Sequence, residues 1–494
     1  MTQLVIIGMV IALVAHDALR GATAASPTQP AWSPTPGPNA VWWTLTAYAV
    51  IALATHLWVW RCARALDRTG NVAYLWSARS LTSTARLATL LIFASSLFLL
   101  AWLDRVRETL GDWVILDEII AMSPALGVIF LGYWSYGIID RRLREASIFA
   151  SVERGEVIHP PRPAWSYMTD QVRHQVLFLL VPMWMVLAWV EAVGIGAAWL
   201  APRGAGWLET GTGSLVIGVI DASGALAVFA LAPPIVRRIW KTERLGRGEL
   251  RSRLEELCAR HGVRHRGILL WRTHGTMING AVMGLLPGLR YILLTDLLLE
   301  RLDDREVEAV MAHELGHIVR RHVPWLLGGM AASLSLSALI AGWAGSAVAI
   351  FLGADGPIAQ IVDVSAALLG ILIGLELVGR ISRMFEREAD AFAVQHLAGM
   401  RTGGSGKGAL ITEEAADGMR AALLAVAREN HIPLAKWTWR HGSLSGRISR
   451  IGELVGKRVG SLDIDRAANR VRWWIVLALA LVGLASVLNS SGIL

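Results

Sequence analysis

The sequence predicts a mainly α-helical, polytopic membrane protein with about nine transmembrane helices and one small α+β domain. Of its 494 residues, 54% are hydrophobic and only 17% are charged, and the mean hydropathy is +0.48. A water-soluble protein carries more charge and less apolar sequence, so the bilayer is expected to be the main solvent of this chain. Because a hydrocarbon layer of ~30 Å needs about 20 helical residues to cross it, long apolar runs indicate the spans.

Nine apolar runs have the length of a span. They lie near residues 3–19, 41–60, 86–103, 118–138, 175–200, 213–236, 323–352, 359–379 and 473–490. The first run is the weakest, because His16 and Asp17 interrupt it. A signal peptide is the alternative for this segment, but no Lys or Arg precedes Leu4 and no small-residue cleavage site follows directly. We therefore expect a retained span.

The formal net charge of +8 follows the predicted spans. Five arginines lie between residues 61 and 86 and six between 141 and 173, whereas the alternating connections are poor in Lys and Arg. Under the positive-inside rule, this alternation puts the N-terminus in the cytoplasm and the C-terminus outside. The basic charge therefore indicates membrane topology, and no nucleic-acid partner is expected. Cys62 and Cys258 fall on the predicted cytoplasmic side, where thiols stay reduced, so no disulfide is expected.

Composition divides the chain into three parts. Residues 1–236 are predicted to form an N-terminal multi-span membrane region, residues 237–472 a core that includes a transmembrane hairpin at about 323–379, and residues 473–494 a C-terminal span. Two polar stretches of the core, 237–322 and 380–472, lie on the same predicted membrane side and can form one domain. The proline-rich segment 25–38 is expected to be an extended loop. GGSGKG at 403–408 is expected to be a flexible linker.

The first polar stretch contains signals for both helices and strands. Leu250 to Arg260 is predicted to be a helix that Gly262 ends, and residues 267–272 and 289–294 are predicted strands with the segment INGAVMG between them. A further helix is predicted from about Asp304 to His322. Asp303 can cap this helix, with Glu306 completing a capping box.

A possible metal site lies on that last helix, in the motif HELGH. His313 and His317 are four residues apart, so both imidazoles project from one helix face and can reach one tetrahedral zinc ion. Glu314 lies beside them, in position to accept a proton from an attacking water. The alternative is a pair of unrelated helix histidines with a solvated glutamate.

The third protein ligand that zinc requires is predicted 69 residues further along, in SRMFEREADAF. Glu386 would bind the metal, and Asp390, four residues later on the same helix face, would accept the outer ring N–H of a ligand histidine. Glu388 points to a different face. Taken alone, these acidic residues would be read as a solvated helix face, but their position on the same membrane side as HELGH favours the metal site.

Together these motifs resemble the integral-membrane gluzincins, which comprise the type I CAAX prenyl endopeptidases and the bacterial HtpX-type quality-control proteases. The resemblance covers roughly residues 240–455. The segment that begins at Asn279 and the segment from His441 to Arg447 are also similar to family segments. Gly280 stands where the family has Ala and Gly442 where it has Pro, which weakens what the resemblance implies about substrates.

The resemblance implies a zinc metalloendopeptidase with a zincin-type catalytic domain and one Zn²⁺ per chain. Glu314 would be the general base, and a further donor would stabilise the oxyanion. His441 is our first choice for this donor and Arg447 the second, although Arg447 could equally form a structural ion pair. Asn279, Gly280 and Ala281 would present an edge strand to an extended peptide, unless they form a simple hairpin.

The expected partners are the lipid bilayer and a peptide or protein substrate. Cleavage of membrane-associated or misfolded proteins and CAAX-type processing of prenylated peptides both fit the motifs. The expected location is a bacterial inner membrane, as a multi-pass protein. The alternation of basic loops puts the catalytic domain on the cytoplasmic side.

Other readings of the sequence remain open. A non-catalytic membrane sensor or scaffold could keep zinc for structure, and a transporter would account for carboxylates in the spans but not for HELGH. Cys258, His261 and His265 also have metal-like spacing, but Gly262 should end their helix and keep them from converging.

Overall fold

The computed structural model describes residues 1–24, 39–153, 155, 157–203, 207, 211–353, 357–400, 408–430 and 432–490. The proline-rich segment 25–38 and all but the last residue of GGSGKG lie outside these ranges. The chain divides into two compact units, Met1–Lys241 and Thr242–Leu494. Each unit has its own set of long apolar helices.

In the residues described, all regular secondary structure of the first unit is helical. Its helices are α1 (Thr2–Ala24), α2 (Ala40–Thr69), α3 (Ala73–Leu100), α4 (Trp102–Leu110), α5 (Leu116–Glu153), α6 (Ala164–Gln171), α7 (Phe178–Leu200) and α8 (Gly211–Ile239). A π-helical turn, η1 (Val172–Leu177), joins α6 to α7, and a 3₁₀ turn, η2 (Ala201–Arg203), follows α7. Buried apolar residues of α1, α3 and α5, such as Ile6, Phe93 and Met122, form the main core of this unit.

The structure confirms a mainly α-helical, multi-pass membrane protein with a small α+β domain. Among the described residues, eight helices are long and apolar enough to cross a membrane: α2, α3, α5, α6 with α7, α8, α12, α13 and α16. They correspond to the second to ninth predicted spans. The first predicted span is helical, but its apolar part, Thr2–Asp17, is shorter than the other eight.

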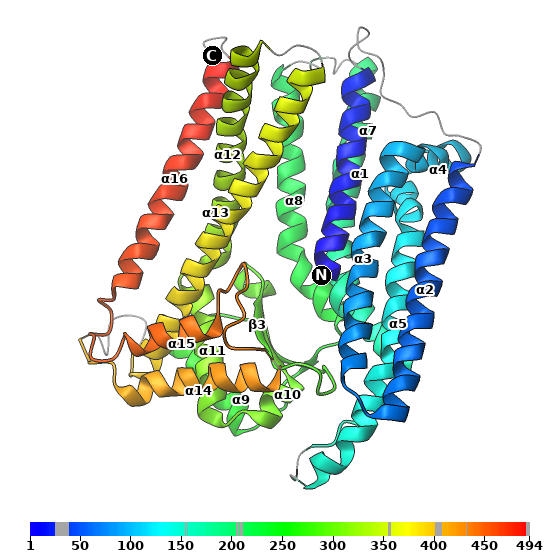
Figure 1. Ribbon diagram of the computed structural model, residues 1–494. Helices are drawn as coiled ribbons and strands as arrows, with labels where there is room; N and C mark the ends of the chain where they lie inside the picture. The colour runs from blue at the N-terminus through cyan, green and yellow to red at the C-terminus, as the bar shows by residue number, and fades with distance from the viewer. Residues whose placement is uncertain are drawn as a thin grey trace. The chain divides into compact units, whose positions relative to one another are not determined.

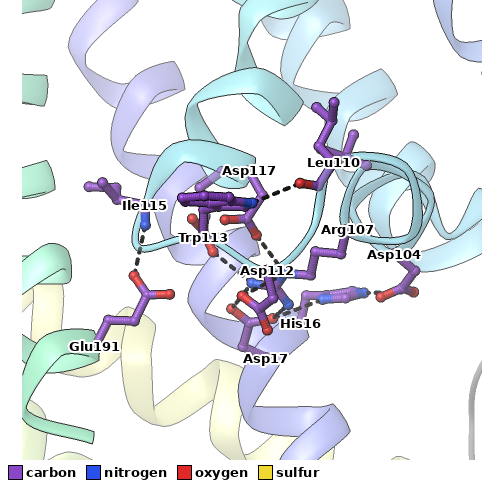
Figure 2. Close-up of polar contacts among 12 residues, drawn as sticks. His16, Asp17, Asp104, Arg107, Leu110, Asp112, Trp113, Ile115, Asp117 and Glu191 are labelled. Carbon is purple, nitrogen blue, oxygen red and sulfur yellow. Dashed lines mark hydrogen bonds and ion pairs between the residues drawn. The ribbon is translucent and has the colours of Figure 1, made fainter. Parts of the chain in front are cut away.

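One end of the first unit is held together by an arginine among carboxylates (Figure 2). Arg107 of α4 forms ion pairs with Asp17 of α1 at 2.7 Å and with Asp117 and Glu118 of α5 at 2.6 Å each. Asp117 and Glu118 are buried, with 1% and 7% of their surface exposed. Because buried carboxylates need a cation, this one guanidinium stabilises the packing of three helices.

The second unit combines three long helices with a small domain. The elements are β1 (Glu243–Arg244), α9 (Glu249–Arg260), β2 (Gly267–Trp271), β3 (Gly280–Met283), η4 (Pro287–Leu289), β4 (Tyr291–Thr295), α10 (Asp296–Arg301), α11 (Asp304–Val319), α12 (His322–Leu352), α13 (Pro357–Leu397), α14 (Glu413–Glu429), α15 (Leu444–Gly452) and α16 (Asp463–Ser490). The sheet order is β1-β2-β4-β3. β2 and β4 are parallel, and β1 and β3 pair antiparallel at the two edges.

Helices α12, α13 and α16 pack side by side, and the small domain lies at one end of them (Figure 1). Helix α13 continues beyond its apolar part into the small domain, where Phe392 and Val394 join a core that also contains Cys258, Leu315 and Ile451. Helix α13 therefore runs without a break from the membrane-spanning part of this unit into the domain that carries HELGH.

The local predictions for the small domain are confirmed, with one correction. Asp303 accepts a hydrogen bond from the Glu306 N–H and Glu306 returns one to Asp303, which forms the capping box of α11. The helix predicted to reach His322 instead ends at Val319. Arg321 has a φ of +54°, a left-handed conformation that an α-helix cannot contain, and a new helix begins at His322.

Candidate metal centre and active site

Helix α11 presents both histidines of HELGH toward helix α13. Gly316, between them, allows this close approach, because a Cβ at this position would lie 3.2 Å from the Ala389 Cα and 3.2 Å from the Phe392 Cβ. The backbones of α11 and α13 therefore touch where the motif residues lie. This contact brings Glu386 within reach of both histidines.

The side chains of His313, His317 and Glu386 converge on one point. The two Nε2 atoms are 3.3 Å apart, and each lies 3.7 Å from a Glu386 carboxylate oxygen. Ligands about 2.0–2.2 Å from a tetrahedral zinc ion would be about 3.3–3.6 Å from one another. Among the described residues, this is the only group of three or more His, Cys, Asp or Glu side chains whose ligand atoms could hold one metal ion. The donors therefore fit zinc in type, number and spacing.

Asp390 contacts the ring of His313 on the side away from Glu386. Its Oδ1 lies 3.0 Å from His313 Nδ1, within hydrogen-bonding reach. The Arg447 guanidinium of α15 donates to both oxygens of Asp390, with Nε–Oδ2 at 2.8 Å and NH2–Oδ1 at 2.5 Å. A carboxylate paired with arginine can only accept from the imidazole, so the His313 proton stays on Nδ1 and leaves Nε2 free for a metal.

Glu314 lies beside the histidines, next to the edge strand β3. Burial raises the pKa of the Glu314 carboxyl to about 7, an effect that His313 opposes and Glu386 adds to. The Val282 backbone N–H of β3 hydrogen-bonds to this carboxylate and lowers its pKa. By contrast, burial lowers the pKa of His317 to about 3, which keeps this imidazole neutral, as a metal ligand must be.

His441 and Arg447 occupy different positions at the site. His441 Nδ1 lies 3.1 Å from Glu386 Oε1, and half of the His441 side chain is exposed. Arg447 is buried, pairs with Asp390, and has NH1 3.4 Å from Glu386 Oε2. The exposed histidine can approach a bound molecule, whereas the guanidinium already has two carboxylate partners.

Strand β3 has a free edge beside α11 in the described sheet. The Asn279 carbonyl accepts a hydrogen bond from the Thr295 N–H, so Asn279 turns its backbone toward β4. Since strand backbones alternate, Ala281 does the same, and Gly280 and Val282 turn their N–H and C=O groups outward. Of the three predicted substrate-binding residues, only Gly280 therefore presents its backbone to this edge, and Val282 joins it.

Two residues near His317 were missed by the sequence reasoning. His322 lies against His317, and the fully buried Glu388 lies against His322. Glu388 does face away from Glu386, as predicted, but toward a histidine instead of solvent. His322 follows the two histidines of HELGH in the sequence. On a continuous helix, however, a residue five positions after His317 would point away from it.

Cys258, His261 and His265 do not converge in the structure, as expected. Gly262 has a φ of +64° and follows α9. His261 instead contacts His396 of α13, with Nε2 and Nδ1 2.8 Å apart, and His396 Nε2 lies 3.0 Å from Glu308. These contacts form a polar chain in which the two histidines are buried and Glu308 is partly exposed.

The small domain and its flanking helices resemble known proteins. Residues 245–455 match the model of Peptidase family M48. A protease HtpX homolog of Aeropyrum pernix is 27% identical over 220 residues, which cover 42% of this chain and 65% of the length of that relative. The crystal structure of S. mikatae Ste24p aligns with a TM-score of 0.44 and 16% identity, over 85% of this chain and 100% of that one.

Proposed function

Residues 245–455 belong to Peptidase family M48, and on that premise we propose that this chain is a zinc-dependent endopeptidase of the membrane. It would hydrolyse peptide bonds of membrane-associated or misfolded proteins. The observation that carries the proposal is the spacing of the His313, His317 and Glu386 ligand atoms beside Glu314. Neither a transporter nor a scaffold needs a buried glutamate next to such a ligand set.

Three residues would hold one zinc ion: His313, His317 and Glu386. The ion, when bound, supplies a Lewis acid that polarises the attacking water and the scissile carbonyl. Glu314 takes the proton from that water and passes it to the leaving amine. A pKa raised to about 7 suits this exchange, because a general base works best when its pKa lies near the operating pH.

His441 is the residue best placed to stabilise the oxyanion. Its ring borders Glu386 and is half exposed. Nδ1 donates to the Glu386 carboxylate, so the proposed oxyanion donor is the Nε2–H of the imidazolium form of His441. Arg447 holds Asp390 in place, and through it the ring of His313. The two candidates for oxyanion donor thus take different roles in the proposed mechanism.

The substrate would lie extended along β3. The outward N–H and C=O groups of Gly280 and the outward carbonyl of Val282 offer hydrogen bonds to a peptide that adds to the sheet edge. The Val282 N–H already contacts Glu314, so a peptide at this edge would pass beside the base. The distribution of arginines favours the cytoplasmic side of the membrane for this domain.

A pair of glutamate variants tests the proposal. Glu314→Gln keeps the shape of the side chain but removes the base, so we expect zinc content to stay at one per chain and turnover to fall by about 10²–10⁴-fold. Glu256→Gln is the matched control, because Glu256 is exposed on α9, where it pairs with Arg260. Cleavage of a misfolded membrane-protein reporter and of a prenylated peptide would be measured with detergent-purified protein.

The outcomes separate the competing functions. Loss of cleavage in Glu314→Gln alone, with zinc retained, supports the endopeptidase. Equal cleavage by wild type and Glu314→Gln would show a contaminating protease. Zinc binding without cleavage of either substrate would favour the zinc-containing scaffold, and absence of zinc from the wild type would overturn the metal site.

A further inference from the structure

A second histidine lies directly behind the proposed zinc ligand His317. The left-handed turn at Arg321 reverses the chain after α11, so His322, the first residue of α12, returns to the face of α11 that carries His317. The two Nδ1 atoms are 2.8 Å apart. His322 is 3% exposed, and its ring stacks on Phe385 of α13 with centroids 4.6 Å apart and planes 5° apart.

The far side of His322 is held by a buried ion pair. His322 Nε2 lies 2.9 Å from Glu388 Oε2, and Arg472 NH2 lies 2.6 Å from the same oxygen. Glu388 is on α13 and fully buried, whereas Arg472 is on α16, the C-terminal long helix. Arg472 NH2 also donates to the Arg320 carbonyl, 3.2 Å away, at the end of α11. Four side chains from four helices thus form one continuous chain that ends at His317.

The carboxylate determines where each proton in this chain lies. Glu388, paired with Arg472, can only accept, so His322 must carry a proton on Nε2 and donate it. A neutral His322 then offers a lone pair at Nδ1, and His317 must donate from its own Nδ1. The Nε2 of His317 is left unprotonated and faces His313 and Glu386.

We propose that His322, Glu388 and Arg472 are positioning residues that fix the ring and the tautomer of His317 for metal binding. They do for His317 what Asp390 and Arg447 do for His313. A carboxylate capped by arginine holds the proton on the outer ring nitrogen, directly in His313 and through the intervening ring of His322 in His317. Because Arg472 lies on α16, the C-terminal span is a structural part of the metal centre. This inference rests on the proposed zinc site.

The test is the zinc affinity of full-length protein in detergent, measured by competition with a chelator of known affinity. His322→Phe keeps a ring to stack on Phe385 but cannot accept from His317. We expect it to bind zinc about 10- to 100-fold more weakly. His322→Asn places an amide oxygen near the position of Nδ1 and should restore affinity to within about threefold. Arg472→Met, which leaves the His317–His322 contact intact, should weaken binding less than His322→Phe.

His396→Phe is the matched control. It breaks a comparable chain formed by the buried His261 and His396 and the partly exposed Glu308, which does not reach the metal ligands. Its zinc affinity should equal that of the wild type. The thermal midpoint of each zinc-free variant would be recorded as well, and the cobalt(II)-loaded proteins compared by visible absorption. For His322→Phe, a positioning role predicts altered metal affinity and an altered cobalt spectrum at an unchanged zinc-free midpoint. Arg472→Met should lower the midpoint as well, because it leaves the buried Glu388 carboxylate without its arginine.

The possible failures can be told apart. A wild type that binds no zinc would overturn the proposed function and this inference together. If the wild type binds zinc and His322→Phe binds it equally well, the metal site stands and the positioning role is refuted. Equal weakening by His322→Phe, His322→Asn and His396→Phe would mean that only general packing was disturbed, which also refutes the inference.

Discussion

Replacing Arg447 with methionine separates the two roles that the sequence left open for this residue. Methionine is unbranched and matches the aliphatic stem of arginine but has no charge, so the packing of α15 should survive while the guanidinium is lost. Asp390, which is 4% exposed, would then be buried with His313 Nδ1 as its remaining partner among the described residues. If Arg447 is a structural partner, the main effect of Arg447→Met is on stability.

The magnitude follows from the burial of the pair. Removing one partner of a buried ion pair costs about 3–5 kcal/mol, because the other charge stays buried without compensation. Since about 1.4 kcal/mol corresponds to a tenfold change in an equilibrium constant, the unfolded fraction of the second unit should rise roughly 150- to 4,000-fold. An oxyanion donor would instead lower turnover about 10²–10³-fold with little change in stability.

Two native cysteines allow each unit to be followed separately. Cys258 is 1% exposed in the core of the second unit, and Cys62 is 4% exposed in the first. The rate at which a thiol reagent labels each buried cysteine under native conditions reports how often its unit opens. We expect Arg447→Met to speed the labelling of Cys258 roughly 150- to 4,000-fold and to leave the labelling of Cys62 unchanged.

A clear result would refute this reasoning. If Cys258 in Arg447→Met is labelled at the wild-type rate while turnover falls 100-fold or more, Arg447 acts on the reaction and not on the fold. Arg447→Lys adds a second check, since lysine keeps the charge but cannot form the two-point contact with Asp390. Its labelling rate should lie between those of the wild type and Arg447→Met.

Further predictions concern stability, metal binding and the edge strand. Arg107→Met should destabilise the first unit by about 3–5 kcal/mol, which would be measured as faster labelling of Cys62. The control Arg105→Met breaks an exposed ion pair and should cost less than about 1 kcal/mol. Equal labelling of Cys62 in both variants would contradict this. Gly316→Ala should weaken zinc binding about tenfold or more, because the added methyl group would push α11, which carries the two histidines, away from α13, which carries Glu386. Unchanged zinc affinity in a chelator competition would refute this. Gly280→Ala places a methyl group 2.9 Å from a Val310 methyl, so it should displace β3 and slow peptide hydrolysis. Adding Val310→Ala removes this contact and should restore the rate of hydrolysis. A double variant as slow as Gly280→Ala would show that this contact does not set the position of β3.

Much of the fold and part of the site could be predicted because they depend on local rules. Apolar runs longer than the bilayer predict spans whatever their neighbours are. The capping box at Asp303 and the helical spacing of His313 and His317 are set within a few residues of the chain. Glu386 could be proposed because zinc requires a third ligand, not because its own surroundings were visible in the sequence.

The sequence by itself determined the membrane class, the helix that carries HELGH and the candidate ligand types. Only the tertiary structure decided what surrounds them: the glycine contact between α11 and α13, the arginine that holds Asp390, and the return of His322 to His317. Arg447 and Asp390 are 57 residues apart, and Arg472 and Glu388 are 84 residues apart. Such contacts follow from how whole helices pack, and no periodicity within one segment encodes them. The turn at Arg321 shows the same limit, since its left-handed backbone arises where α11 meets α12 and no glycine marks it in the sequence.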